Sequence, residues 1–160
     1  NNKKIIFHKR DEILSLFNTP LNETLKACIK FVKDKNVNFD YVYVINTSSP
    51  FISNDDISNS FNIIDFFKLD KVIGVIKQTN NYYFHNGKGL KQLNDNSYLR
   101  LERNEIYEEV GGITIFNKKN MFKNKHKIGH VLCDRIRSFQ VKDENDFLYA
   151  KFVNKKLRNI

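Results

Sequence analysis

The sequence predicts an α/β fold, a three-layer domain whose sheet is mainly parallel. Runs of β-branched and aromatic residues at 41–45, 71–77 and 111–116 have the composition of strands that are covered on both faces. A stretch with helical periodicity, 23–35, precedes the first run, and another, 55–67, lies between the first two. Strands that alternate with helices are usually joined by right-handed crossovers, so this order favours parallel neighbours.

The N-terminal part begins with a short apolar strand predicted at residues 4–7, which a basic run ends. Residues 11–16 are expected to form a helical turn or a loop. Asn22 is a suitable N-cap for the helix at 23–35, because its side chain can accept a hydrogen bond from a free backbone N–H group. That helix places four apolar residues on one face: Leu25, Cys28, Ile29 and Val32.

The strand at 41–45 is followed by a polar turn at 46–49, and Pro50 then ends the strand because it has no N–H group for a ladder. Ser53 or Asn54 can cap the helix at 55–67, whose first turn carries two aspartates. The residues of this helix that we expect to be buried are Ile57, Phe61, Ile64 and Phe67. Open α/β sheets bind ligands where such a strand ends and its helix begins.

The rest of the chain continues the alternation, and the whole of 1–160 is expected to form one domain. An irregular hairpin is predicted at 80–93, turning at Asn86-Gly87. The strand at 111–116 is followed by a helical turn at 118–122. Short extended pieces at 128–132 and 138–141 lead into a closing helix at 144–156.

Composition is that of an ordinary globular protein, with 41% hydrophobic and 28% charged residues in a chain of 160. No apolar run approaches the roughly 20 residues that span a bilayer, so no membrane partner is expected. Cys28 and Cys133 lie far apart without metal or redox spacing, which favours a reduced, cytoplasmic protein.

The net charge of +9 leaves three interpretations open. Basic surfaces bind nucleic acid, they bind anionic small ligands, or they are simply solvated. The lysines are scattered rather than gathered on one element, except at 118–127 and 151–158. Nucleic acid is therefore the least favoured partner.

Four segments in order resemble the acylneuraminate cytidylyltransferases, the CMP-sialic acid synthetase type. Residues 7–15 are similar to the family's Arg-Pro-acidic-Leu segment, and residues 46–50 to its Gln-Pro-Thr-Ser-Pro turn. Arg100, seven residues before Tyr107, looks like the family's Arg followed by Tyr-x-x-Asn-Gly. Residues 138–147 are similar to its closing Ser-Ile-Asp-Ile-Asp segment and helix.

The resemblance implies a fold of the nucleotide-diphospho-sugar transferase type and transfer of CMP from CTP to an acidic, nonulosonic sugar with release of pyrophosphate. It also implies Mg²⁺ as cofactor, and a homodimer in which an insertion at 78–107 contacts the partner. Family members have an N-terminal strand and a loop that cradles the nucleotide. No segment of this sequence resembles that loop, so we expect this N-terminal portion of the family's fold to be absent from this chain. A catalytically silent sugar- or nucleotide-binding relative is the alternative.

The candidate substrate-binding residues are Asn46, Ser49, Arg100, Tyr107 and Gly111. Arginine's planar fork suits a carboxylate or a phosphate, although a surface arginine in a charged loop has the same appearance. Asn46 and Ser49 can bind ligand hydroxyls or only cap the turn. Tyr107 can line a pocket or be a half-buried core residue, and Gly111 permits close backbone approach in either case. No catalytic residue is assigned.

The departures from the family pattern concern the metal. The family's two metal-binding aspartates fall on Gln140 and Lys142, neither of which offers a carboxylate. Asp143 and Asp146 lie close by and are the candidates for shifted ligands, although Asp143 is also suited to capping the closing helix.

Overall fold

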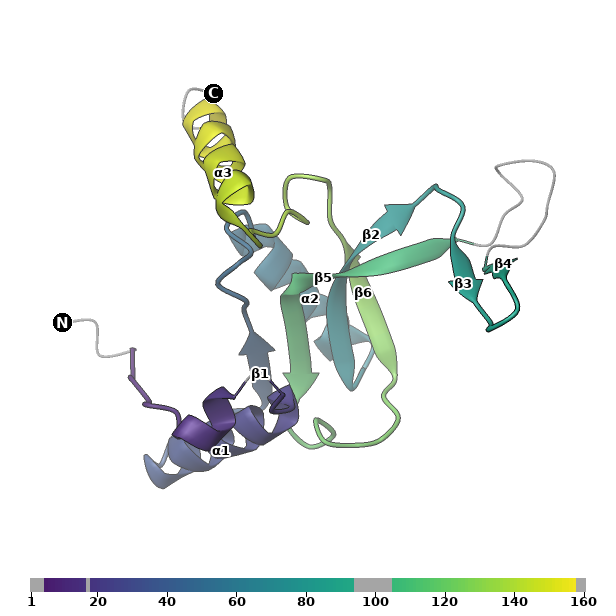
Figure 1. Cartoon of the computed structure of the whole chain (residues 1–160). Helices are drawn as coiled ribbons and strands as arrows, with labels where there is room; N and C mark the ends of the chain where they lie inside the picture. Colours follow the sequence, from purple (N-terminus) through teal and green to yellow (C-terminus); the bar gives the residue numbers. More distant parts are fainter. Residues whose placement is uncertain (1–4, 17, 94–104, 158–160) are drawn as a thin grey trace. The chain divides into compact units, whose positions relative to one another are not determined.

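The computed structural model describes residues 5–16, 18–93 and 105–157, which belong to two compact units, residues 1–40 and 41–160 (Figure 1). The first unit contains a 3-10 helix (Glu12–Ser15) and α1 (Leu21–Asp34). Within it His8 stacks on Phe31, with ring centroids 4.2 Å apart.

Two sequence predictions for this unit are wrong. Residues 5–7 are irregular rather than a strand, and Phe7 is 91% exposed. An apolar run forms a strand only where a neighbour takes up its backbone N–H and C=O groups. The helix starts at Leu21 with Pro20 as N-cap, so Asn22 lies inside the first turn and caps nothing.

The second unit is built on a four-stranded sheet in the order β1-β5-β2-β6. These strands are β1 (Tyr41–Val44), β2 (Lys71–Gln78), β5 (Ile106–Asn117) and β6 (Ile128–Leu132). β2 and β6 are parallel, whereas β5 is antiparallel to both β1 and β2. Three strands therefore run one way and β5 runs against them.

The sequence predicted a mainly parallel sheet, but the sheet is mixed, because β5, which contains the run at 111–116, is antiparallel to both of its neighbours. The segment before β5 contains a small hairpin, β3 (Tyr83–His85) and β4 (Leu90–Gln92), as the Asn86-Gly87 turn predicted. A strand that enters antiparallel needs no helical crossover. The alternation of strands and helices therefore breaks at this point.

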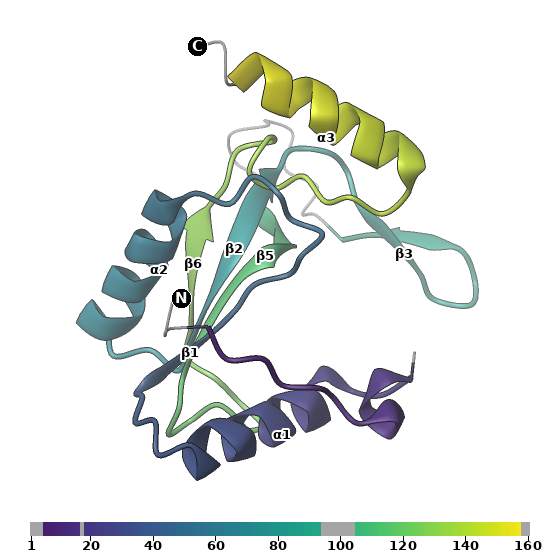
Figure 2. The same ribbon diagram turned by 90° about the vertical axis from the view of Figure 1, so that its left-hand side faces the viewer.

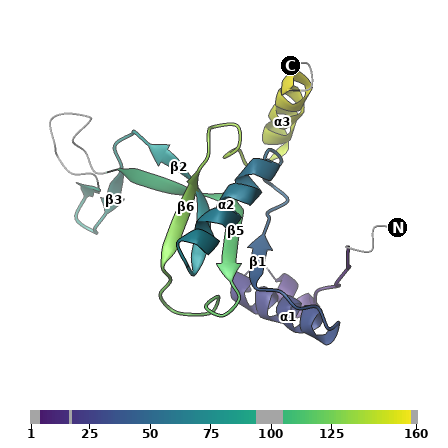
Figure 3. The same ribbon diagram turned by 180° about the vertical axis from the view of Figure 1, so that it is seen from behind.

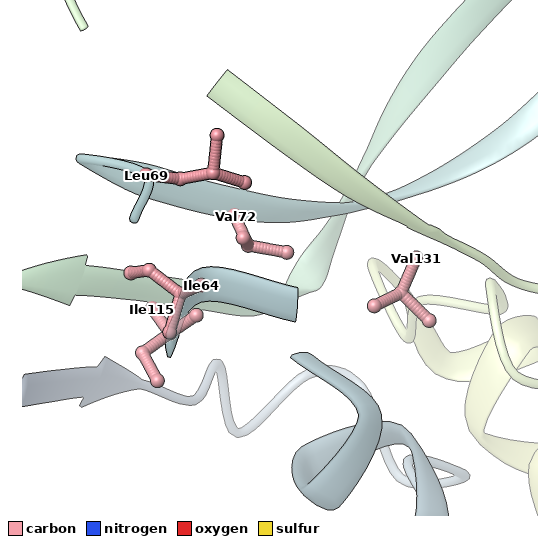
Figure 4. Packing of buried hydrophobic residues seen from close by; sticks show 5 residues of the cluster. All are labelled: Ile64, Leu69, Val72, Ile115 and Val131. Atoms are coloured by element: carbon pink, nitrogen blue, oxygen red, sulfur yellow. The ribbon is translucent and has the colours of Figure 1, made fainter. Parts of the chain in front are cut away.

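Helix α2 (Asn54–Phe66) covers one face of the sheet (Figure 3). Ile64 of α2 and Leu69, which follows it, pack on strand residues Val72, Ile115 and Val131 (Figure 4). Ile64 is 1% exposed, as predicted, but Phe61 and Phe67 are 45% and 57% exposed. The helix buries Asp56 and Ser60 instead, which a hydrophobic pattern does not predict.

β5 changes direction at two glycines. Ile73 pairs with Thr114, but its neighbour Gly74 pairs with Val110, so β5 carries three extra residues between these pairs. The extra residues form a large bulge that bends the strand (Figure 1). Val110 and Ile113, on either side of Gly111-Gly112, consequently reach the same buried cluster with Cys133.

Helix α3 (Glu144–Leu157) lies beyond the carboxyl end of β1 (Figure 2). No helix in the described residues is both long enough and apolar enough to cross a lipid bilayer. A helical layer on the second face of the sheet, a single domain and an insertion at 78–107 stay predictions.

Candidate functional site

The turn after β1 is closed by its own polar groups. The backbone N–H of Ser49 donates to the Asn46 carbonyl at 3.0 Å, and the N–H of Ser48 donates to Asn46 Oδ1 at 3.1 Å. The side-chain oxygen of Asn46 thus holds the turn, which is the capping role that Asx residues often have. Its amide nitrogen is directed to the β5 bulge, 3.6 Å from the position that a Cβ on Gly111 would take.

Ser49 projects inward from the same turn. It is 8% exposed, and within the described part of the chain its Oγ has no hydrogen-bond partner. A Cβ on Gly112 would lie 2.7 Å from the Ser49 Cβ and 2.4 Å from the Ile52 Cδ1. The bulge therefore has glycine where the turn approaches the backbone of β5 most closely.

The segment before α3 forms the other side of this region. Val141 N–H donates to the Ser48 carbonyl at 2.8 Å, which joins the segment to the turn. The preceding side chain, Gln140, extends over Gly111, where a Cβ would meet its Nε2 at 2.5 Å. The amides of Asn46 and Gln140 thus converge on one glycine from two segments that lie about ninety residues apart in the sequence.

The carboxylates proposed as metal ligands are engaged in capping. Asp143 Oδ1 accepts from the Asp146 N–H at 2.9 Å, and Asp146 Oδ2 accepts from the Lys142 N–H at 2.9 Å. No group of three His, Cys, Asp or Glu residues that could hold a metal ion exists within residues 5–16, 18–93 and 105–157. With Gln140 and Lys142 at the family's aspartate positions, these donors do not fit Mg²⁺, which prefers carboxylate oxygens.

A buried ion pair lies at the start of α2, a few residues after the turn. Asp56 is fully buried and accepts from both the N–H and the hydroxyl of Ser53, completing a capping box. Arg137 Nη1 donates to Asp56 Oδ1 at 2.5 Å, and its Nε donates to Asp134 Oδ2 at 2.9 Å. The network ties the start of α2 to the loop after β6.

These contacts shift the pKa values of the network. Hydrogen bonds from the backbone and side chain of Arg137 hold the pKa of Asp134 below its ordinary value. The carboxylate of Asp134, followed by the charge of Asp56, raises the pKa of Arg137. Burial, helped by the negative charge of Asp56, raises the pKa of the Cys133 thiol, so this cysteine stays protonated and is not set up as a nucleophile.

A cavity of about 510 Å³ opens beside the turn, between it and α3. Thr47, Ser48 and Phe51 line it from the turn, and Val141 contributes from the segment before α3. Phe147, Lys151 and Asn154, spaced at three and four residues, line it from one face of α3. The cavity therefore lies between the turn at the end of β1 and helix α3.

The structure brings together some of the candidate residues and separates others. Asn46, Ser49 and Gly111 lie together at the turn and the bulge. Tyr107 instead pairs with Lys77 in the first part of β5, donates to Glu105 and lies tilted against His130, with ring centroids 5.2 Å apart. Arg100 lies outside the described residues.

Sequence reasoning missed the ion pair and the cavity wall. Arg137 meets Asp56 across 81 residues, and no local pattern announces such a pair. The spacing of Phe147, Lys151 and Asn154 was a readable signal, since it places a cation, an amide and an aromatic ring on one helical face.

No protein-family model matches the chain, and no curated protein matches it. The chain is similar to a solved structure, that of 4-diphosphocytidyl-2C-methyl-D-erythritol synthase from Anaerococcus prevotii DSM 20548. The TM-score is 0.57 and the sequence identity 14%, over 79% of this chain and 64% of that chain. The similarity shows that the two proteins share a mixed α/β fold, and the chain spans less than two thirds of its neighbour's length.

Proposed function

We propose that this chain belongs to a CTP-dependent cytidylyltransferase whose acceptor is an acidic, nonulosonic sugar. The observation that carries the proposal is the turn at the end of β1, where Asn46, Gly111 and Gln140 converge beside a ligand-sized cavity. The likeness of the fold to a synthase that makes a diphosphocytidyl product supports the nucleotide, and the resemblance of the four segments supports the acidic sugar.

In the proposed reaction a hydroxyl oxygen of the sugar attacks the α-phosphorus of CTP. A new P–O bond forms, the bond to the β-phosphate oxygen breaks, and pyrophosphate leaves while the hydroxyl proton passes to solvent or a base. Such chemistry depends on positioning and on neutralising charge. Asn46 and Gln140 would hold the ligand through their amides, and Arg100 is proposed to meet an anionic group.

Mg²⁺ enters no step of this proposal, because the described carboxylates do not fit it. A homodimer formed through 78–107, a pocket role for Tyr107, a cytoplasmic location and a part in surface-polysaccharide synthesis also belong to the proposal. They rest on the resemblance of the sequence to the family.

A catalytically silent binding relative is the second candidate. It is favoured by one observation, the replacement of the two family aspartates by Gln140 and Lys142 while Asp143 and Asp146 cap α3. Such a protein would keep the pocket and bind the sugar or the nucleotide without turnover.

One experiment separates the two candidates. The purified protein is mixed with CTP, Mg²⁺ and a panel of acidic sugars, and pyrophosphate is measured alongside sugar binding. Pyrophosphate release with any sugar supports the transferase and removes the silent relative. Sugar binding without pyrophosphate would overturn the transferase and leave the binding protein.

A further inference from the structure

The cavity between the turn and α3 has an unusual combination of walls. Phe51 and Phe147 supply aromatic surface, and Phe51 is backed by Phe139 at 6.2 Å between ring centroids. Thr47 and Asn154 add a hydroxyl and an amide. Among the described residues that line the cavity, Lys151 is the only charged side chain.

Lys151 is an exposed residue that lies at the aromatic wall of the cavity. Its Nζ lies 4.4 Å from the centre of the Phe147 ring, within the range of a cation–π contact. No carboxylate among the described lining residues competes for this ammonium group. A ligand anion would therefore find a cation that no carboxylate of the lining neutralises.

The side chains that line the cavity indicate which kind of ligand it can bind. One ammonium group suits one carboxylate, whereas a triphosphate chain normally needs several cations or a helix N-terminus. Hydroxyl and amide groups suit a polyhydroxylated molecule, and aromatic faces suit its C–H surface. The cavity volume of about 510 Å³ is large enough for a polyhydroxylated small molecule.

We propose that this cavity is the acceptor subsite and binds a sugar acid, with Lys151 pairing with its carboxylate. The proposal rests on the proposed function for the identity of the acceptor, and adds where the sugar binds and which cation reads its charge. Lys151 is a binding residue here and takes no part in bond making.

The test compares binding of N-acetylneuraminic acid with that of its methyl ester, by calorimetry and without CTP. The ester keeps the ring and hydroxyls but removes the charge. Lys151→Met tests the cation, Lys151→Arg tests rescue, and Lys155→Met, one turn further along α3 and outside the cavity lining, is the matched control. Lys151 and Lys155 are both exposed, so the fold is expected to tolerate all three changes.

The expected result is that Lys151→Met and the ester each weaken binding by about tenfold, while Lys151→Arg and Lys155→Met bind as the unchanged protein does. Equal binding of acid and ester, equal losses in Lys151→Met and Lys155→Met, or no binding of the acid would each overturn the proposal.

The experiments distinguish failure of this proposal from failure of the proposed function. If the acid binds in a way that depends on Lys151 but no pyrophosphate is released, the subsite proposal stands and the proposed transfer reaction is refuted. If Lys151→Met releases pyrophosphate with an unchanged KM for the sugar, the transfer reaction stands and the subsite proposal is refuted. Binding of CMP that depends on Lys151 more than binding of the acid does would assign the cavity to the nucleotide, which also overturns the proposal.

Discussion

The two glycines of the β5 bulge are expected to respond differently to a methyl group. In Gly112→Ala the Cβ would lie 2.4 Å from Ile52 and 2.7 Å from Ser49, so the turn itself must move, at a cost of about 1–3 kcal/mol. In Gly111→Ala the nearest atom is the end of the flexible Gln140 side chain, and the loss of stability should be well below that.

Urea unfolding of both variants measures this difference. Because Gly111→Ala displaces the Gln140 amide, it should weaken ligand binding while the fold stays intact. Equal destabilisation by the two substitutions would show that the turn does not approach Gly112 as described.

Arg137 neutralises a carboxylate that has no access to water. Removing its charge in Arg137→Met leaves Asp56 buried beside Ser53 alone, and we expect a loss of about 1–3 kcal/mol in the free energy of unfolding. The double variant Asp56→Asn/Arg137→Met should recover part of this loss, because it removes the unpaired charge. A double variant less stable than Arg137→Met would contradict the pairing.

Asp134 gives a pH dependence whose sign follows from its lowered pKa. The charged form is favoured in the folded protein, so its stabilisation is present above the unfolded value of about 3.9 and is lost as the pH falls through the lower folded value. Unfolding free energies of the unchanged protein and Asp134→Asn should therefore differ at neutral pH and converge in acid. A difference that grows towards low pH would refute the assignment.

Helix α3 provides a test of the metal candidates. Asp143→Ala removes the side chain that accepts from the Asp146 N–H, and should cost about 1 kcal/mol as the loss of an N-cap does. If the carboxylates only cap, Mg²⁺ should leave the Tm of the unchanged protein and of Asp146→Asn equally unaffected. A rise in Tm with Mg²⁺ that Asp146→Asn abolishes would make them metal ligands.

The elements themselves were largely predictable from local pattern, and their arrangement was not. The runs at 41–45 and 71–77 became β1 and β2, and the Ser53 cap and the closing helix lie where capping residues and periodicity placed them. The direction of β5 is decided by its partners, since a β-branched run has the same composition whichever way it runs. Phe61 was wrongly assigned to the core because periodicity does not show that Asp56 and Ser60 occupy the buried face.

The candidate site was predictable only in part for the same reason. The turn at 46–49 is a local signal, and so is the glycine pair. The contact of Gln140 with Gly111 and the pair formed by Arg137 and Asp56 depend on tertiary structure that no spacing encodes.

All strand pairing of the four-stranded sheet and both apolar clusters lie within residues 41–160. We therefore expect a fragment of these residues to fold by itself and keep the sheet. Amide NMR spectra of the fragment and the whole chain should overlay for core residues such as Val72 and Ile115. A fragment with unfolded spectra would show that the sheet requires residues 1–40.

The bulge also resets the alternation of side chains along β5. Residues that pair across a sheet share a face, so Val110 lies on the face of its partner Gly74, and Thr114 lies on the opposite face with Ile73. Val110 and Ile113 are three residues apart and would point to opposite faces of an unbroken strand, yet both pack against Cys133. The buried positions of β5 therefore follow two separate alternations, one on each side of Gly111-Gly112, and the apolar positions of homologous sequences should change phase there.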